Sequence, residues 1–297
     1  ATRGEALPPH VRAVAAEGIR QVKLIDATPI GLNVRSTVAT YAGVHDELRR
    51  AFAATPEAKA AGRRAGDFSY NTGALRCPTC DGTGTISLDV QFLPDVEIPC
   101  PDCGGSRYGS EAERIRCRVR GAARGYSMPE LMRLSVDEAL DACAPLAGVC
   151  RRLRVLRELG LGYLTLGEAT PGLSGGEAQR LKLASEMGRG QQDSVFVFDE
   201  PTIGLHPLDV RTLLGVFDSL IAMGATVIVI EHDLDVIASA DYVIDMGPGG
   251  GAEGGAIVAA GTPERICACA ESRTGACLGR ALRRAAAAAH GRAQPDG

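Results

Sequence analysis

Two short apolar runs that end in polar residues constrain the fold of this chain more than any other feature. The runs are residues 195–198, which are all apolar and lead into Asp199 and Glu200, and residues 225–230, which are apolar except for Thr226 and lead into Glu231 and His232. Continuous apolar runs of this length are typical of strands that are buried on both faces of a parallel sheet. Between them, apolar residues recur at helical spacing from Val210 to Ile221, and Gly224 closes the helix. The sequence therefore predicts a right-handed parallel crossover that brings both polar pairs to one edge of a sheet.

A capping box upstream of the first run marks the start of a helix. Ser174 is the predicted N-cap, Glu177 stands three residues later, and the helix continues to about Met187. The hydroxyl of Ser174 and the amides of Gly175 and Gly176, at the positive end of a helix, suit a terminal phosphate. Taken alone, the string S-G-G-E is more often an ordinary helix cap. The strand, helix and strand that follow favour nucleotide binding.

The same pattern predicts half of an ATP-hydrolysing site. Asp199 would hold Mg²⁺, and Glu200 would polarise the attacking water as general base. His232 is either an ordinary histidine at a strand end or, given its place one strand later, the switch residue that contacts the γ-phosphate. A phosphate loop needs a lysine directly after a glycine, and none of the three lysines of the chain follows one. Residues 247–255 are rich in glycine but lack a strand-to-helix context, so we expect a turn there.

Four of the ten cysteines have the spacing of a zinc site. Cys77 and Cys80 form one C-x-x-C pair, and Cys100 and Cys103 form another after nineteen residues. Two such knuckles complete a tetrahedral site, and because all four positions are filled we expect a structural zinc ion. Alternation of apolar and polar residues over 85–92 predicts a half-exposed strand, so we expect a zinc ribbon on a hairpin. Four reduced core cysteines, or a zinc ion without any contact to a partner, are the alternatives. The remaining cysteines have no comparable spacing and receive no role: 117, 143, 150, 267, 269 and 277.

Length and composition predict a folded protein of about two domains. The chain has 297 residues, of which 45% are hydrophobic. It contains no run of 18 apolar residues and no basic segment followed by an apolar one at its start, so we expect a cytoplasmic protein without a membrane partner. Ala1 in place of methionine suggests a fragment or a processed chain. The net charge is −4, but residues 107–124 contain six arginines against two glutamates, a local charge of +4. Charge alone leaves a solvated basic face and a nucleic-acid contact equally open.

Together these motifs resemble the C-terminal part of the UvrA family, the damage-recognition ATPases of bacterial nucleotide excision repair. The matching stretches lie between about residues 24 and 278. They are both cysteine pairs and residues 29–31, 39–44, 68–71, 92–96, 159–163, 173–184, 199–206 and 229–235. A zinc ribbon before the signature helix separates this family from transporter cassettes and from chaperones with a similar cysteine knuckle.

The resemblance implies an α/β fold, the C-terminal half of an ABC-type ATPase domain with an inserted zinc ribbon and a helical signature region. The expected segments are 1–74 (N-terminal part of the signature region), 75–108 (zinc ribbon), 109–171 (helical signature region), 172–265 (ATPase core) and 266–297 (C-terminal extension and disordered tail). It also implies ATP, Mg²⁺ and Zn²⁺ as cofactors. The nucleotide contacts it implies are Ser174, Gly175, Gly176, Glu177, Gln179, Gly204 and His206.

By resemblance, the whole protein recognises damaged double-stranded DNA at the expense of ATP and passes it to a UvrB-like subunit. Its composite sites form in a homodimer or with a complementary cassette half. Without a phosphate loop, this chain alone is expected to be inactive. Two departures indicate a weakened or specialised ATPase, such as a divergent drug-resistance paralogue: Ala27 replaces the usual glutamine, and Ile203 replaces a threonine. The alternative is a non-catalytic module in which a zinc ribbon and a degenerate cassette bind DNA or a partner.

Overall fold

A parallel three-stranded sheet, in the order β1-β6-β7, forms the centre of the ATPase part. The computed structural model describes residues 7, 9, 11–31, 33–88, 96–118, 125–187, 191–249 and 254–291. Strand β1 (Gln21–Ile25) pairs with β6 (Ser194–Asp199), and β6 pairs with β7 (Thr226–Ile230). Helix α9 (Pro207–Ala222) connects β6 to β7, so the predicted parallel unit of strand, helix and strand is confirmed.

Strand β1 adds to the core a segment that we expected to belong to the signature region. Its sequence, QVKLI, places Gln21 and Lys23 among apolar residues, and no motif marks it as a core strand. Its partner β6 is far away in sequence, so only the three-dimensional pairing reveals where it belongs. Residues 21–25 therefore share the sheet with the ATPase core that we expected to begin at residue 172.

One face of this sheet is packed against helices. Phe196 and Phe198 of β6 are at most 1% exposed, and the ring centroids of Phe198 and Phe217 of α9 are 4.8 Å apart. Helix α8 (Gly175–Glu186) contributes the buried side chains of Leu181 and Ala184 to the same apolar cluster. The predicted helix that begins after Ser174 is thus confirmed.

The opposite face of the sheet is exposed. Val22 and Leu24 of β1 are 65% and 60% exposed, and Ile228 and Ile230 of β7 are 50% and 54% exposed. The register aligns Leu24 with Val197 and Val197 with Ile228, so these apolar side chains share one face. The prediction that the second strand is buried on both faces is therefore wrong for this chain. Strand β7 lies at the edge of the sheet, and none of its residues is buried.

The helical signature region surrounds a second part of the same apolar core. Its elements are α1 (Val38–Tyr41), α2 (Val44–Ala53), α3 (Pro56–Ala60), the 3-10 turn η1 (Ala65–Phe68), α4 (Glu111–Arg114), β4 (Arg116–Cys117), β5 (Tyr126–Ser127), α5 (Met128–Met132), α6 (Val136–Ala142), α7 (Ala147–Glu158) and the 3-10 turn η2 (Thr170–Gly172). Leu48 and Phe52 of α2 and Leu153 of α7 are fully buried in this core. Capping boxes at Ser127 and Ser135 fix the starts of α5 and α6.

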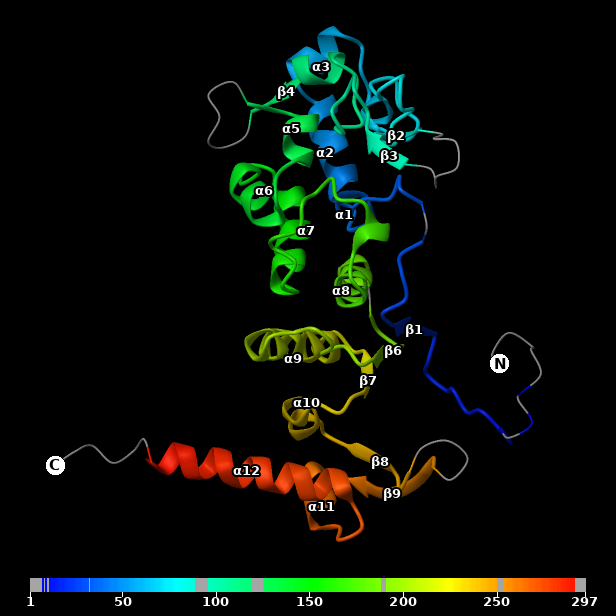
Figure 1. Cartoon of the computed structure of the whole chain (residues 1–297), viewed down its shortest axis with the longest axis vertical. Helices are drawn as coiled ribbons and strands as arrows, with labels where there is room; N and C mark the ends of the chain where they lie inside the picture. The colour runs from blue at the N-terminus through cyan, green and yellow to red at the C-terminus, as the bar shows by residue number, and fades with distance from the viewer. Residues whose placement is uncertain are drawn as a thin grey trace, which may run out of the picture.

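The predicted ribbon on a hairpin is confirmed. Strands β2 (Thr85–Leu88) and β3 (Val96–Pro99) pair in antiparallel register between the two cysteine pairs. The expected strand extended to residue 92, and residues 89–92 lie outside the described residues. In Figure 1 the hairpin lies beside α2, at the end of the molecule that carries the short helices of the signature region.

The chain closes with a hairpin and two helices. Helix α10 (Leu234–Ser239) leads into the antiparallel hairpin β8 (Val243–Gly247) and β9 (Ala256–Gly261). Helix α11 (Pro263–Ala268) and the long α12 (Arg273–Gly291) follow, and they lie at the end opposite the ribbon (Figure 1). Helix α12 occupies much of the expected C-terminal extension, and residues 292–297, where we expected a disordered tail, lie outside the described residues. Among the described helices none is both long and apolar enough to cross a membrane.

Candidate nucleotide site and zinc centre

The carboxyl ends of β6 and β7 bring Glu200 and His232 together. The Nδ1 atom of His232 lies 3.7 Å from Oε1 of Glu200, and both side chains reach solvent, with 77% and 45% exposure. Glu200 has a φ angle of +46°, a left-handed conformation that is uncommon for residues other than glycine. Its backbone N–H donates to the carbonyl of Ile230 at 2.9 Å, which ties the turn to the neighbouring strand. Asp199, the last residue of β6, is exposed beside them. The parallel register thus places the predicted catalytic residues at one sheet edge.

Ser174 caps helix α8 as predicted. Its hydroxyl accepts a hydrogen bond from the N–H of Glu177 at 3.4 Å, and the carboxylate of Glu177 accepts one from the N–H of Ser174 at 2.7 Å. The hydroxyl of Tyr163 donates to the other carboxylate oxygen of Glu177. Burial opposes ionisation of Glu177, but the hydrogen bonds from Tyr163 and Ser174 outweigh it and lower the pKa of this carboxyl. The predicted phosphate-facing end of the helix is therefore rigidly capped.

Close packing explains both glycines of the first helical turn. A Cβ atom at Gly175 would lie 3.2 Å from Cβ of Ala27, and one at Gly176 would lie 3.0 Å from the carbonyl oxygen of Ile203. The start of α8 is thus pressed against the segment after β1 and against the turn after β6. A side chain at either position would separate elements that carry predicted nucleotide contacts.

Gln179 is buried and faces the interior of the protein. Its Nε2 atom donates to the carbonyl oxygens of Ile25 and Asp199, both at 2.9 Å, and its side chain is almost fully buried. This amide therefore holds the ends of β1 and β6 against helix α8. Both of its N–H groups are used in these contacts, so a nucleotide contact for Gln179 stays a prediction from the resemblance.

A cluster that the motifs did not indicate surrounds the position of the missing glutamine. Lys182 of α8 donates to the carboxylate of Asp26 at 2.5 Å and to the hydroxyl of Thr28 at 2.7 Å. Hydrogen bonds from Lys182 and then from Thr28 lower the pKa of Asp26. Lys182 and Asp26 are 156 residues apart in sequence, and no local pattern links them. Ala27, between the two polar residues, has no polar side chain to offer a nucleotide.

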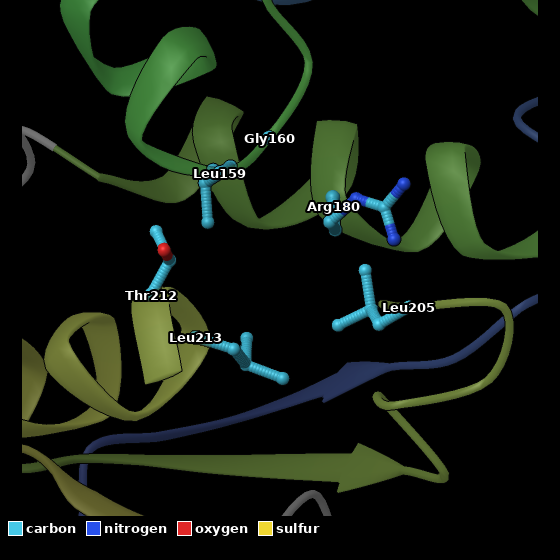
Figure 2. Close-up of a pocket in the computed structure, with 6 residues that line it drawn as sticks. All are labelled: Leu159, Gly160, Arg180, Leu205, Thr212 and Leu213. Carbon is cyan, nitrogen blue, oxygen red and sulfur yellow. The ribbon is translucent and has the colours of Figure 1, made fainter. Parts of the chain in front are cut away.

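The predicted contacts Gly204 and His206 lie in the exposed turn between β6 and α9. Gly204 has a φ angle of +73°, which suits glycine in this turn. Behind the turn is a small cavity of ≈ 10 Å³, drawn in Figure 2 and lined by Leu159, Gly160, Arg180, Leu205, Thr212 and Leu213. That volume holds about one water molecule and not a nucleotide. Gly204 and His206 therefore lie on an open surface and do not line this cavity.

The four predicted zinc ligands converge at the base of the ribbon. All four Sγ atoms lie within 4.8 Å of one another, with Cys77 and Cys100 at 3.9 Å and Cys80 and Cys103 at 3.7 Å. Zn–S bonds of about 2.3 Å in a tetrahedron require S···S distances of about 3.8 Å, so the site fits zinc. The described residues contain no second cluster of three or more potential ligands.

The backbone around the first knuckle favours the thiolate form of one of the four cysteines, Cys80. The N–H of Gly84 donates to Sγ of Cys80 at 3.3 Å. Burial opposes ionisation of Cys80, but amide hydrogen bonds from Gly84 and Gly82 lower the pKa of this thiol to about 7. Burial raises the pKa of Cys103 to about 12. Zinc would hold the sulfurs as thiolates and join the two knuckles.

Two arginines of the basic stretch, residues 107–124, make contacts within the protein. Arg107 is only 8% exposed, donates to the carbonyl of Val34 at 2.9 Å and stacks over the ring of Tyr70. Arg116 makes a bidentate pair with Glu130, at 2.6 and 3.0 Å. Two of the six arginines counted in residues 107–124 are therefore engaged within the protein, because their guanidinium groups anchor the ribbon and the start of α5.

The sheet, the signature helix and the four-cysteine ribbon define a class, the C-terminal half of an ABC-type ATPase domain with a zinc-ribbon insertion. No family model matches the chain. The chain is 46% identical over 284 residues to UvrABC system protein A of Mycobacterium bovis. This alignment covers 95% of the chain and 29% of the relative. The same protein of Thermus thermophilus is 46% identical over 273 residues, 92% of this chain and 28% of the relative.

A solved structure agrees with these relatives. The crystal structure of UvrA2 from Deinococcus radiodurans superposes with a TM-score of 0.81 at 44% identity, over 90% of this chain and 32% of that one. The resemblance to the UvrA family is therefore confirmed: the chain is homologous to UvrABC system protein A. It spans less than a third of the length of these relatives.

Proposed function

We propose that this chain is part of an ATP-dependent DNA-damage recognition subunit of bacterial nucleotide excision repair. The homology to UvrABC system protein A supports the class of protein. The observation that carries the catalytic part of the proposal is the 3.7 Å separation of Glu200 and His232 at the ends of adjacent parallel strands. That arrangement suits a general base beside a group that senses the terminal phosphate of ATP.

In the proposed site Glu200 polarises the attacking water, and His232 contacts the γ-phosphate. Asp199 holds Mg²⁺, which when bound neutralises the charge on the phosphate oxygens. The two carboxylates and the imidazole reach solvent along one sheet edge, so a nucleotide can approach them from outside the chain. Positioning and electrostatic stabilisation supply most of the catalysis in this kind of reaction.

The N-terminus of helix α8 contacts the phosphates of a nucleotide that is bound to another cassette. Its N-terminus carries the partial positive charge of the helix dipole, together with the hydroxyl of Ser174 and the amides of Gly175 and Gly176. The carboxylate of Glu177 accepts hydrogen bonds from the N–H of Ser174 and from Tyr163, and these bonds stabilise the N-terminus of the helix. A composite site of this kind is complete only between two cassettes.

A complementary cassette half covers the exposed face of the sheet. Parallel sheets are almost always covered on both faces, whereas Val22, Leu24, Ile228 and Ile230 are each at least half exposed. The chain also lacks a lysine that follows a glycine, and so it lacks the lysine of a phosphate loop. Both observations support a phosphate-loop segment packed on this face, supplied either by the same polypeptide or by a second chain.

The zinc ribbon and its surroundings contact DNA in this proposal. Zinc has a structural role and holds the two knuckles together. Of the basic stretch, Arg114 and Arg118 are exposed and can contact phosphates. Damaged double-stranded DNA is the proposed substrate, and a UvrB-like subunit is the proposed recipient.

ATP hydrolysis by this chain mixed with a complementary half that carries a phosphate loop tests the proposal. We expect hydrolysis that neither half shows alone and that Glu200→Gln abolishes. Ala27, in place of the usual glutamine, favours a second candidate, a degenerate cassette that binds DNA without turnover. DNA binding without any Glu200-dependent hydrolysis by the reconstituted pair would exclude the enzyme and support that module.

A further inference from the structure

The turn after β6 and the turn after β7 share one anchor, the carboxylate of Glu231. Its Oε1 atom accepts hydrogen bonds from the backbone N–H of Thr202 at 2.9 Å and from the Thr202 hydroxyl at 2.5 Å. Its Oε2 atom accepts from the backbone N–H groups of His232 at 2.8 Å and Asp233 at 3.0 Å. A single side chain thus connects two segments that follow different strands.

Each of the connected turns carries a residue of the proposed catalytic site. Thr202 lies inside the turn that Glu200 begins, because the N–H of Ile203 donates to the carbonyl of Glu200 at 3.2 Å. His232 directly follows Glu231. The 3.7 Å separation of Glu200 and His232 therefore depends on a carboxylate that belongs to neither of them.

The bridge requires an ionised carboxylate. Glu231 is half-buried, and burial opposes its ionisation, yet the hydrogen bonds from Thr202 and from the backbone of Asp233 and His232 lower its pKa. Hydrogen bonds to a charged acceptor are stronger than those between neutral groups. A glutamine at this position would direct its NH₂ group either toward the two N–H groups of His232 and Asp233 or toward the backbone N–H of Thr202, so only one side of the bridge could survive intact.

We propose that Glu231 is a positioning residue for ATP hydrolysis, which holds the turn of Glu200 and the backbone of His232 in fixed register. The inference rests on the proposed function and deepens it. Glu231 acts through Thr202 and through the main chain of His232. Because the attacking water must be aligned with the terminal phosphate, a displacement of either turn lowers the rate of the chemical step more than the affinity for ATP.

The test compares Glu231→Gln with Asp218→Asn in this chain combined with its complementary cassette half. Asp218 is an exposed carboxylate on the neighbouring helix α9 and serves as the matched control. We expect Glu231→Gln to lower kcat by about 10- to 100-fold with KM for ATP changed by less than about threefold. Hydrogen exchange should accelerate in both segments, residues 200–206 and 231–236, and in the control it should accelerate in neither.

A double-mutant cycle with Thr202 separates positioning from general destabilisation. Thr202→Ala should lower kcat less than Glu231→Gln, because the backbone N–H of Thr202 remains. The kcat of the double variant should lie within about threefold of the kcat of Glu231→Gln alone, because both changes break the same bridge. Thr202→Ser keeps the hydroxyl and should retain the kcat of the unmodified chain. If Glu231→Gln fails to fold, a lower kcat in the alanine variant than in the serine variant supports the inference, and equal values overturn it.

The outcomes distinguish this inference from the proposed function. Faster exchange in Glu231→Gln with an unchanged kcat, while Glu200→Gln still abolishes hydrolysis, overturns the role of Glu231 and leaves the proposed function intact. Additive losses in the double-mutant cycle also overturn it. An unmodified pair without Glu200-dependent hydrolysis refutes the proposed function, and the inference falls with it.

Discussion

Replacement of Gln179 by leucine should destabilise the chain through one well-defined contact. The leucine side chain has nearly the same volume and keeps the apolar packing of α8, but it removes both donors to the carbonyls of Ile25 and Asp199. Each lost hydrogen bond costs about 1 kcal/mol net, and an unsatisfied buried carbonyl adds about 1 kcal/mol or more. We therefore expect a loss of about 2–4 kcal/mol in the free energy of unfolding.

Glutamate at the same position gives a sharper comparison. At pH 7 its carboxylate would face two carbonyl oxygens without a proton to donate, so Gln179→Glu should be less stable than Gln179→Leu. Part of the loss should be recovered at lower pH, where a protonated carboxyl can donate one hydrogen bond. Gln192 is exposed, and Gln192→Leu is the matched control, with an expected change within about 0.5 kcal/mol.

Urea unfolding followed by far-UV circular dichroism measures all three variants, because the chain has no tryptophan for fluorescence. The urea midpoints of the two Gln179 variants should fall, while the slope of the unfolding free energy against urea concentration stays the same. A Gln179→Leu variant within about 0.5 kcal/mol of the unmodified chain, or a Gln179→Glu variant more stable than it at pH 7, would refute the inference that this amide clamps the strand ends.

Three further predictions follow from other sites. Burial, and then the charge of nearby Arg49, lowers the pKa of His45 in the folded chain from 6.5 to about 4. As the pH falls, His45 is therefore protonated in the unfolded chain before it is protonated in the folded chain. The part of the unfolding free energy that depends on neutral His45 is complete above about pH 6.5. It is lost as the pH falls toward 4, by up to about 1.4 kcal/mol per pH unit. The pH dependence of the unfolding free energy of His45→Gln should lack this contribution. A Cβ atom at Gly82, where φ is +80°, would lie 1.7 Å from the carbonyl oxygen of Tyr70. Gly82→Ala should therefore cost more than about 2 kcal/mol in urea unfolding, against about 1 kcal/mol for Gly104→Ala, whose Cβ meets nothing within 4 Å. Metal analysis should find one zinc ion per chain, and Cys100→Ser should lose it with little change in the rest of the core, because the cysteines form a separate cluster. Full zinc retention in that variant would contradict the four-cysteine site.

The motifs that sequence predicted well are those whose geometry is local. The capping box at Ser174 depends on atoms three residues apart, and each cysteine pair depends on one tight turn. The strand, helix and strand around α9 follow from the spacing of apolar residues along a short stretch. Each pattern carries its own backbone conformation, so no distant partner is needed to recognise it.

Arg107 shows why the charge of a sequence stretch does not give the charge of a surface. Within residues 107–124 the local charge suggested a basic surface, yet Arg107 stacks on Tyr70 and donates to Val34, a residue from a distant segment. The chemistry that makes a guanidinium group a good phosphate ligand also lets it satisfy buried carbonyls. Which of the two it does depends on whether a distant segment lies within its reach.

The sequence by itself determined the local elements, the four cysteines that cluster in the ribbon and the residues at the ends of β6 and β7. Only the tertiary structure decided that β1 joins the sheet, that Gln179 turns inward and that one face of β7 is uncovered. Local elements follow from backbone periodicity and neighbouring side chains, whereas burial and hydrogen-bond partners are set by segments that are far apart in sequence and meet only in the fold.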